Sequence, residues 1–248
     1  EQLNVLIGSE PLEGEGSDLV KLHMMKLLNE KYGIIEEDFL SAELEIVPSG
    51  KARELGLDRS MILAYGHDDR ICAFTSLKAI LDQKETPKKT SCCLLVDKEE
   101  IGSVGATGAQ SLFMENTIAE LMLLANGTES MVKVRRAMAN TKMLSSDVSA
   151  GVDPLYLSVN EKKNAAFMGH GVVFNKYTGA RGKSGSNDAN PEYMAEIRKV
   201  MDDADICFQT AELGKVDQGG GGTIAYIMGN YCMNVIDAGV AVMNMHAP

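Results

Sequence analysis

The sequence lacks features that mark several broad classes of protein. It has no tryptophan, and its aromatic residues amount to only 5% of the chain. Sugar-binding sites often stack their ligand on aromatic rings, so this composition counts against a carbohydrate-active site. No apolar stretch is long enough to cross a membrane, and no signal peptide is visible. We therefore expect a protein that does not associate with membranes.

Cysteine and basic residues are also few. The five cysteines include no Cys-x-x-Cys pair, and most have apolar neighbours, which favours reduced core thiols and a cytoplasmic location. Lys and Arg number 24 against 35 Asp and Glu, for a net charge of −11. Nucleic-acid binding needs a basic face, so the charge balance argues against such a partner.

Most of the chain alternates between strand and helix patterns. Short apolar runs predict strands at residues 61–65, 91–96, 142–144, 205–210 and 233–236. Apolar residues at helical spacing predict helices from residue 70 to 81 and over 114–126, 192–204 and 223–228. Such alternation indicates an α/β sandwich with a largely parallel core sheet.

The first sixty residues have a different texture. They predict a strand at 3–8, a helix at 18–31 that stops near Gly33, and an alternating strand at 41–48. We therefore expect residues 1–60 to form a separate subdomain or insertion, and residues 61–248 to form the main domain. Both ends of the sequence look cut, so we expect the chain to be incomplete.

Potential ligands recur where apolar runs end. Asp68, Glu99, Glu100, Asp147 and His246 all follow such runs. Open α/β sheets bind ligands outside the carboxyl ends of their strands, so these side chains can converge. Carboxylate oxygen with imidazole nitrogen suits Zn²⁺, Co²⁺ or Mn²⁺. The adjacent residues Glu99 and Glu100 can have different roles, one as a metal ligand and the other in proton transfer. Alternatively, they belong to a solvated, charged turn.

Four ordered motifs carry a resemblance to a known family. They are Gly-His-Asp-Asp-Arg at 66–70, Asp-Lys-Glu-Glu-Ile-Gly-Ser at 97–103, Ser-Asp-Val at 146–148 and Asn-Met-His at 244–246. With these motifs the chain resembles the aspartyl-aminopeptidase family of two-metal aminopeptidases, in its bacterial and vacuolar aminopeptidase I-like branch. The resemblance implies a three-layer α/β/α sandwich of the zinc-exopeptidase kind, with residues 1–60 forming part of an inserted dimerisation subdomain.

The resemblance also implies a role for each site residue. Asp68 would bridge two divalent metal ions, most simply Zn²⁺. Asp147 would be a terminal ligand of one ion, and Glu100 and His246 would complete the other. Glu99 would be the general base that takes a proton from the water between the ions and later delivers it to the leaving amine. The enzyme would thereby remove N-terminal residues from peptides. The chemistry is consistent, because two ions about 3.5–4 Å apart acidify the water between them and a nearby Glu then suffices as base.

Other expectations concern the substrate and the assembly. His170 lies in a Gly-His-Gly turn, Lys176 in a polar loop at 176–179, and Gly221 in a run of four glycines. All three are weaker candidates for the substrate pocket; His170 and Lys176 can equally be plain surface residues. Asp69 can assist a metal ligand, but an acid at a helix start also favours the helix dipole. The family implies a homo-oligomer of dimers that assemble into a dodecamer.

One departure from the family pattern stands out. The family has a further ligand in a His-x-Asp motif, yet only His23 and His67 precede Asp68 here, and neither fits. We expect the motif to lie before residue 1. The missing histidine also keeps a second hypothesis open, a non-catalytic assembly or binding protein with the same fold. A glycosidase that uses two carboxylates is a third, weaker hypothesis.

Overall fold

The protein is described by a computed structural model, which covers residues 5–127, 130–180, 184–215, 217–218 and 220–246. The chain forms two compact units, Glu1–Ser49 and Gly50–Pro248. The assignment of residues 1–60 to a dimerisation subdomain stays a prediction.

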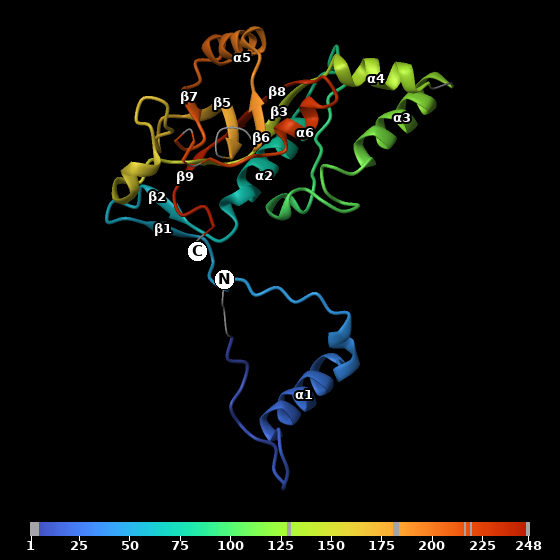
Figure 1. The fold of residues 1–248 in the computed structure, drawn as a ribbon, viewed down its shortest axis with the longest axis vertical. Helices are drawn as coiled ribbons and strands as arrows, with labels where there is room; N and C mark the ends of the chain where they lie inside the picture. The colour runs from blue at the N-terminus through green and yellow to red at the C-terminus, as the bar shows by residue number, and fades with distance from the viewer. Residues whose placement is uncertain (1–4, 128–129, 181–183, 216, 219, 247–248) are drawn as a thin grey trace. The chain divides into compact units, whose positions relative to one another are not determined.

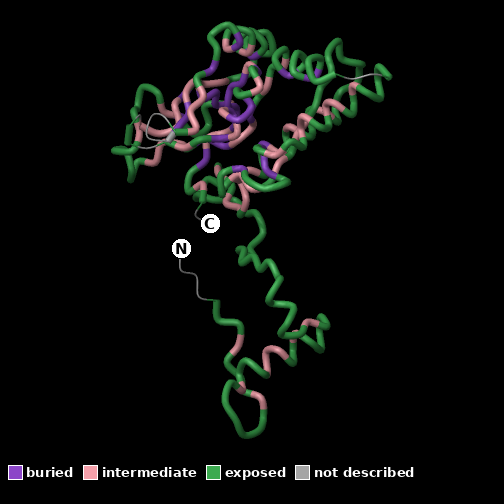
Figure 2. Tube along the Cα trace, turned by 45° about the vertical axis from the view of Figure 1, so that its right-hand side comes forward, coloured by how far each residue is buried: buried purple, intermediate pink, exposed green. Residues whose placement is uncertain are grey.

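The first unit is built around one helix. Helix α1 spans Leu19–Tyr32, close to the predicted range, and ends where Gly33 adopts a left-handed φ of 73° and donates its N–H to the carbonyl of Asn29. The strand predicted at 41–48 does not form, because none of the described residues pairs with it. Of the strand predicted at 3–8, residues 5–8 are not in a strand and the rest lies outside the described residues. No described residue of this unit is buried, as Figure 2 shows.

The second unit contains a mixed five-stranded sheet. Its strands are β3 (Lys142–Ser146), β5 (Val172–Ala180), β6 (Ser184–Asp188), β7 (Phe208–Glu212) and β8 (Asn234–Gly239). The order is β3-β8-β5-β6, with β7 also pairing with β5. Strands β3 and β8 are parallel, as are β5 and β7, whereas β5 runs antiparallel to β6 and β8. The mixed α/β fold predicted from the alternating pattern is confirmed.

Alternating residues of β8 define the two faces of this sheet. Ile236 and Ala238 pack with Tyr193 of α5 (Pro191–Asp203). Val235, which points the opposite way, packs in a cluster with Met138 and Met228. Those two methionines belong to α4 (Met131–Ala139) and α6 (Ala225–Gly229). Helices therefore cover both faces, which gives the three layers (Figure 1).

Shorter elements surround the sheet. Helices α2 and α3 span His67–Leu81 and Phe113–Asn126, β1 (Arg53–Leu55) pairs with β2 (Met61–Leu63), and β4 (Ser149–Ala150) pairs with β9 (Ala241–Val242). Two short 3₁₀ helices, η2 and η3, lie at Glu99–Ile101 and Pro154–Val159. No helix among the described residues has the length and apolar character needed to span a membrane.

Three sequence predictions about this unit were wrong. Most of the cysteines are not core residues, since Cys92, Cys207 and Cys232 are exposed and Cys72 alone is buried. The apolar run at 91–96 is not a strand, because none of the described strands pairs with it. Directly after the run, Asp97 forms an isolated bridge with Gly108. The segment 176–179 is not a loop but part of β5. Its polar sequence does not predict a strand, and pairing with β6 stabilises the extended backbone.

Helix α4 offers a matched test of this packing. Met138 is 1% exposed in the core, whereas Met131 at the start of the same helix is 46% exposed. We expect Met138→Ala to lower the free energy of unfolding by about 2–5 kcal/mol. Met131→Ala should change it by about 0.5 kcal/mol or less. Urea denaturation measures both, and similar losses from the two substitutions would contradict the described layer.

Candidate metal centre

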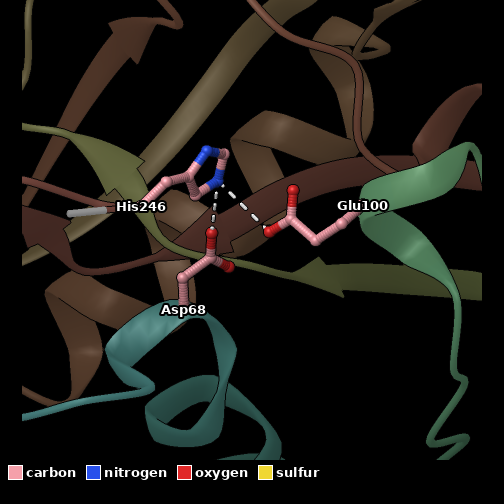
Figure 3. Close-up of side chains that lie close together, drawn as sticks. All are labelled: Asp68, Glu100 and His246. Carbon is pink, nitrogen blue, oxygen red and sulfur yellow. Dashed lines mark hydrogen bonds and ion pairs between the residues drawn. The ribbon is translucent and has the colours of Figure 1, made fainter. Parts of the chain in front are cut away.

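Three of the predicted ligands meet at one point. The Nε2 atom of His246 lies 2.9 Å from Oδ2 of Asp68 and 3.2 Å from Oε1 of Glu100. The three residues come from the end of the described chain, the first turn of α2 and the turn η2, and their side chains point toward one another (Figure 3). One nitrogen and two carboxylates in this arrangement match the ligands that Zn²⁺ takes in proteins.

A second group of carboxylates shares Asp68. Asp68, Asp69 and Asp147 each place one oxygen so that all three atoms lie within 4.8 Å of one another, as do the ligand atoms of Asp68, Glu100 and His246. Asp68 is thus common to two groups. A carboxylate in that position suits a bridge between two cations.

The local backbone explains how these acids come together. Asp68 and Asp69 depart from helical angles inside the first turn of α2, with ψ values of 108° and 45°. Asp147 follows β3 and extends its ladder, since its N–H donates to the carbonyl of Ala238 in β8 at 3.3 Å. Gly239 lies against this turn so closely that a Cβ there would sit 1.8 Å from the carbonyl oxygen of Asp147. Only glycine fits at that contact.

The acids of the centre disfavour one another's charge. Burial, with the nearby charges of Asp69, Asp68 and Glu99, raises the pKa of Asp147 to about 8. Burial likewise raises the pKa of Asp69 to about 6, and its Oδ1 is buried without a hydrogen-bond partner among the described residues. A divalent cation would supply both the missing partner and the missing positive charge. The residues present therefore fit a metal.

The two adjacent glutamates also have raised pKa values. Burial is the main cause for Glu99, followed by the charges of Glu100 and Asp68. For Glu100 burial again leads, followed by its contact with Asp68. Glu99 belongs to neither of the two ligand groups. Of the two glutamates, Glu100 alone belongs to one of these groups.

Sequence reasoning undervalued one residue of this centre. Asp69 was expected chiefly to complement a helix dipole, yet its carboxylate lies with those of Asp68 and Asp147. The signal available in the sequence was its position directly after Asp68. A regular helix would have turned it elsewhere, and the irregular first turn of α2 does not.

None of the three weaker pocket candidates belongs to either of these groups. Lys176 forms an ion pair with Asp188 across the β5–β6 ladder. His170 contacts the ring of Phe167, with 5.7 Å between ring centroids, and lines a separate open depression with Cys207. Gly221 accepts a hydrogen bond from the N–H of Gly179 at 2.9 Å.

Comparison with known proteins agrees with the motifs. The model of a family described as aminopeptidase I zinc metalloprotease (M18) matches residues 2–248. The chain belongs to this M18 family. A probable M18 family aminopeptidase 1 from Clostridium acetobutylicum is 63% identical over the whole of this chain and 53% of its own length.

Solved structures of M18 proteins share the fold. The crystal structure of aminopeptidase I from Clostridium acetobutylicum superposes with a TM-score of 0.88 at 62% identity, covering 99% of this chain and 52% of that one. A Thermotoga maritima M18 aminopeptidase gives a TM-score of 0.91 at 46% identity, covering 97% of this chain and 53% of that one. The M18 chain thus spans about half the length of the relatives that it matches.

The raised pKa values predict how stability depends on pH. The usual pKa of Asp is about 4, so between pH 4 and about 8 the metal-free folded state holds protons that the unfolded state has released. We expect the metal-free protein to lose stability as the pH rises through this window, and Asp147→Asn to flatten the loss.

Thermal unfolding at pH 5 and pH 8, with and without chelator, measures this effect. Saturating Zn²⁺ should remove most of the loss at pH 8, because the cation replaces the protons. The description of the centre would be contradicted if the metal-free protein were more stable at pH 8 than at pH 5 and Asp147→Asn showed the same change in stability as the parent.

Proposed function

We propose that the protein is a metal-dependent aminopeptidase that removes N-terminal residues from peptides. The observation that carries this proposal is that Asp68 is shared by two groups of potential ligands. One shared carboxylate with separate partners on either side is the arrangement that two-metal hydrolysis needs. Membership of the zinc metalloprotease family M18 supports the same reaction.

The residues divide into ligands and a base. Asp68 would bridge two Zn²⁺ ions, with Asp147 on one side and Glu100 and His246 on the other; Co²⁺ and Mn²⁺ suit the same donors. When bound, the ions would acidify a shared water and polarise the substrate carbonyl. Glu99 would take the proton and return it to the leaving amine, and its raised pKa brings it closer to the pH at which such exchange is efficient.

The Asp147 side of the centre still lacks a nitrogen ligand. Asp68, Asp69 and Asp147 offer only oxygen, and among the described residues His246 is the histidine of the other group. The His-x-Asp motif expected before residue 1 stays a prediction. It would supply the histidine, and Asp69 would then support the ligands from beside them.

The alternative is a non-catalytic member of the family that keeps the fold for assembly or binding. The missing histidine is what favours it. Metal analysis of the full-length protein discriminates, because near-zero divalent metal with no hydrolysis would favour the alternative. Family membership leaves the glycosidase hypothesis without support.

The surroundings of the reaction are also proposals. Peptides are the substrates, Gly221 is a wall of their pocket, and the ion pair of Lys176 with Asp188 favours a surface role for that lysine. We place the protein in the cytoplasm as a homo-oligomer, dimers assembling into a dodecamer. The first unit has exposed apolar side chains that contact between subunits would bury, which favours an oligomer. Leu6, Leu40 and Leu44, for example, are 85%, 88% and 70% exposed.

Replacing the proposed base gives a direct test. Glu99→Gln keeps the size of the side chain but cannot take a proton, so we expect kcat to fall by about 10²–10⁴-fold. Metal content should be unchanged, because Glu99 belongs to neither ligand group. Hydrolysis of aminoacyl chromogenic substrates by the full-length protein measures kcat, and elemental analysis measures the metal.

Glu120→Gln is the matched control, since Glu120 is exposed on α3. It should behave like the parent protein. Parent-like turnover by Glu99→Gln would remove Glu99 from the mechanism, and loss of metal would instead make it a ligand.

A further inference from the structure

A buried carboxyl in the middle of the sheet belongs to neither ligand group around Asp68. Asp237 of β8 is fully buried and lies opposite Ser145 of β3 and Asn175 of β5. Among the described residues, none of the groups that act on its pKa carries a positive charge. A buried carboxylate without a partner of opposite charge destabilises a fold, so its presence calls for a reason.

Two oxygens at this position have unused hydrogen-bonding capacity. The Oδ1 atom of Asp237 accepts a hydrogen bond from the hydroxyl of Thr223, whereas its Oδ2 has no partner among the described residues. The hydroxyl oxygen of Thr178, a residue that is 1% exposed, likewise has no partner there. Buried polar atoms are nearly always paired, so these two oxygens indicate a shared partner that is not part of the protein chain.

Three hydroxyl groups approach this carboxyl from different elements. Burial raises the pKa of Asp237, and the hydroxyls of Thr223, Ser145 and Thr178 all lower it. The hydroxyl oxygens of Ser145 and Thr223 lie 3.3 Å apart. Thr178 comes from β5, whose pairing with β7 shifts in register within residues 175–177, and such a bulge re-aims the side chains that follow it. Oxygens from three strands and from the segment before α6 therefore gather around one charge.

The charge and the donor atoms select the ligand. A proton on Oδ2 of Asp237 would make that atom a donor, yet it has no hydrogen-bond partner of either kind among the described residues. A buried water would pair with both oxygens but would leave the negative charge unbalanced. Carboxylate and hydroxyl oxygens suit hard cations. A single carboxylate balances one positive charge, which indicates a monovalent ion.

We propose that the oxygens around Asp237 form a buried site for a monovalent alkali cation, Na⁺ or K⁺. Its ligands are Oδ2 of Asp237 and the hydroxyl oxygens of Thr178 and Ser145. Because Thr223 donates its hydroxyl hydrogen to Asp237, Ser145 is the donor in the contact between the two hydroxyls and keeps a lone pair for the cation. The cation joins β3, β5 and β8 at the centre of the sheet. This site does not depend on the proposed aminopeptidase reaction.

Hydrogen exchange in salts of different cations tests this site in the full-length, zinc-loaded protein. NaCl, KCl and tetramethylammonium chloride screen charges equally at one ionic strength, but tetramethylammonium is too large for a buried site. We expect the amides of β8 to exchange about tenfold more slowly in NaCl or KCl, which corresponds to a cation at about ten times its dissociation constant. Equal exchange in the three salts, which a buried water predicts, would overturn the proposal.

A matched pair of substitutions assigns the effect to this carboxyl. Asp237→Asn removes the charge and keeps the shape of the side chain, so its exchange should be the same in all three salts. Asp203 is exposed at the end of α5, where it pairs with Lys199, and Asp203→Asn should keep the salt dependence of the parent. An Asp237→Asn protein that still exchanges tenfold more slowly in NaCl or KCl would overturn the site.

A second variant and a direct observation keep the test decisive if Asp237→Asn does not fold. Thr178→Val removes one ligand and leaves the carboxylate, so we expect the Na⁺ concentration at half effect to rise about tenfold, as for the loss of one polar contact. An unchanged concentration would overturn this ligand set. Crystals grown in RbCl should show the anomalous signal of Rb⁺ beside Oδ2 of Asp237, and the absence of that signal would overturn the site.

Discussion

Carboxylates gathered at one edge of the sheet repel one another, and the surrounding fold holds them there. Two ligand groups share Asp68, and their other carboxylates are those of Asp69, Glu100 and Asp147. The charges of Glu100, Asp68 and Asp69 also raise the pKa of Glu99. Burial and like charge raise the pKa values of four acids around Asp68, namely Asp69, Glu99, Glu100 and Asp147. A fold gains nothing from such crowding by itself. Divalent cations would offset the repulsion and so stabilise the centre.

Strand β8 is the frame that makes the crowding possible. Ile236 and Ala238 bury one face under α5, and Val235 buries the other under α4 and α6. The end of the strand meets the turn that carries Asp147, where Gly239 permits the close approach. The chain then continues through β9 to His246. Core packing and the proposed metal site therefore depend on the same short strand.

Much of this architecture could be predicted from the sequence, and the exceptions have physical causes. Strong local patterns predicted α2, α3, α5 and β8 close to their observed positions. Asp147 follows a strand as its apolar run predicts, whereas Glu100 reaches the centre from the turn η2 and Asp68 from the irregular start of α2. The strand prediction for residues 91–96 was wrong because a strand needs a neighbouring strand to pair with. The local sequence pattern does not show whether such a neighbour exists. The hairpin of β5 and β6 was missed because its polar and glycine-rich sequence reads as a loop until the pairing is known. The position of Asp69 beside Asp68 and Asp147 could not be predicted, because it depends on an irregular helical turn.

The central claim is that Asp68 serves two metal sites at once, and metal stoichiometry tests it most directly. Equilibrium dialysis of the full-length protein against Zn²⁺, followed by elemental analysis, counts the ions bound per protomer. We expect two ions for the parent, about one for Glu100→Gln, and neither at parent affinity for Asp68→Asn. An Asp68→Asn protein that keeps one ion at parent affinity would contradict the bridge and leave two independent sites in its place.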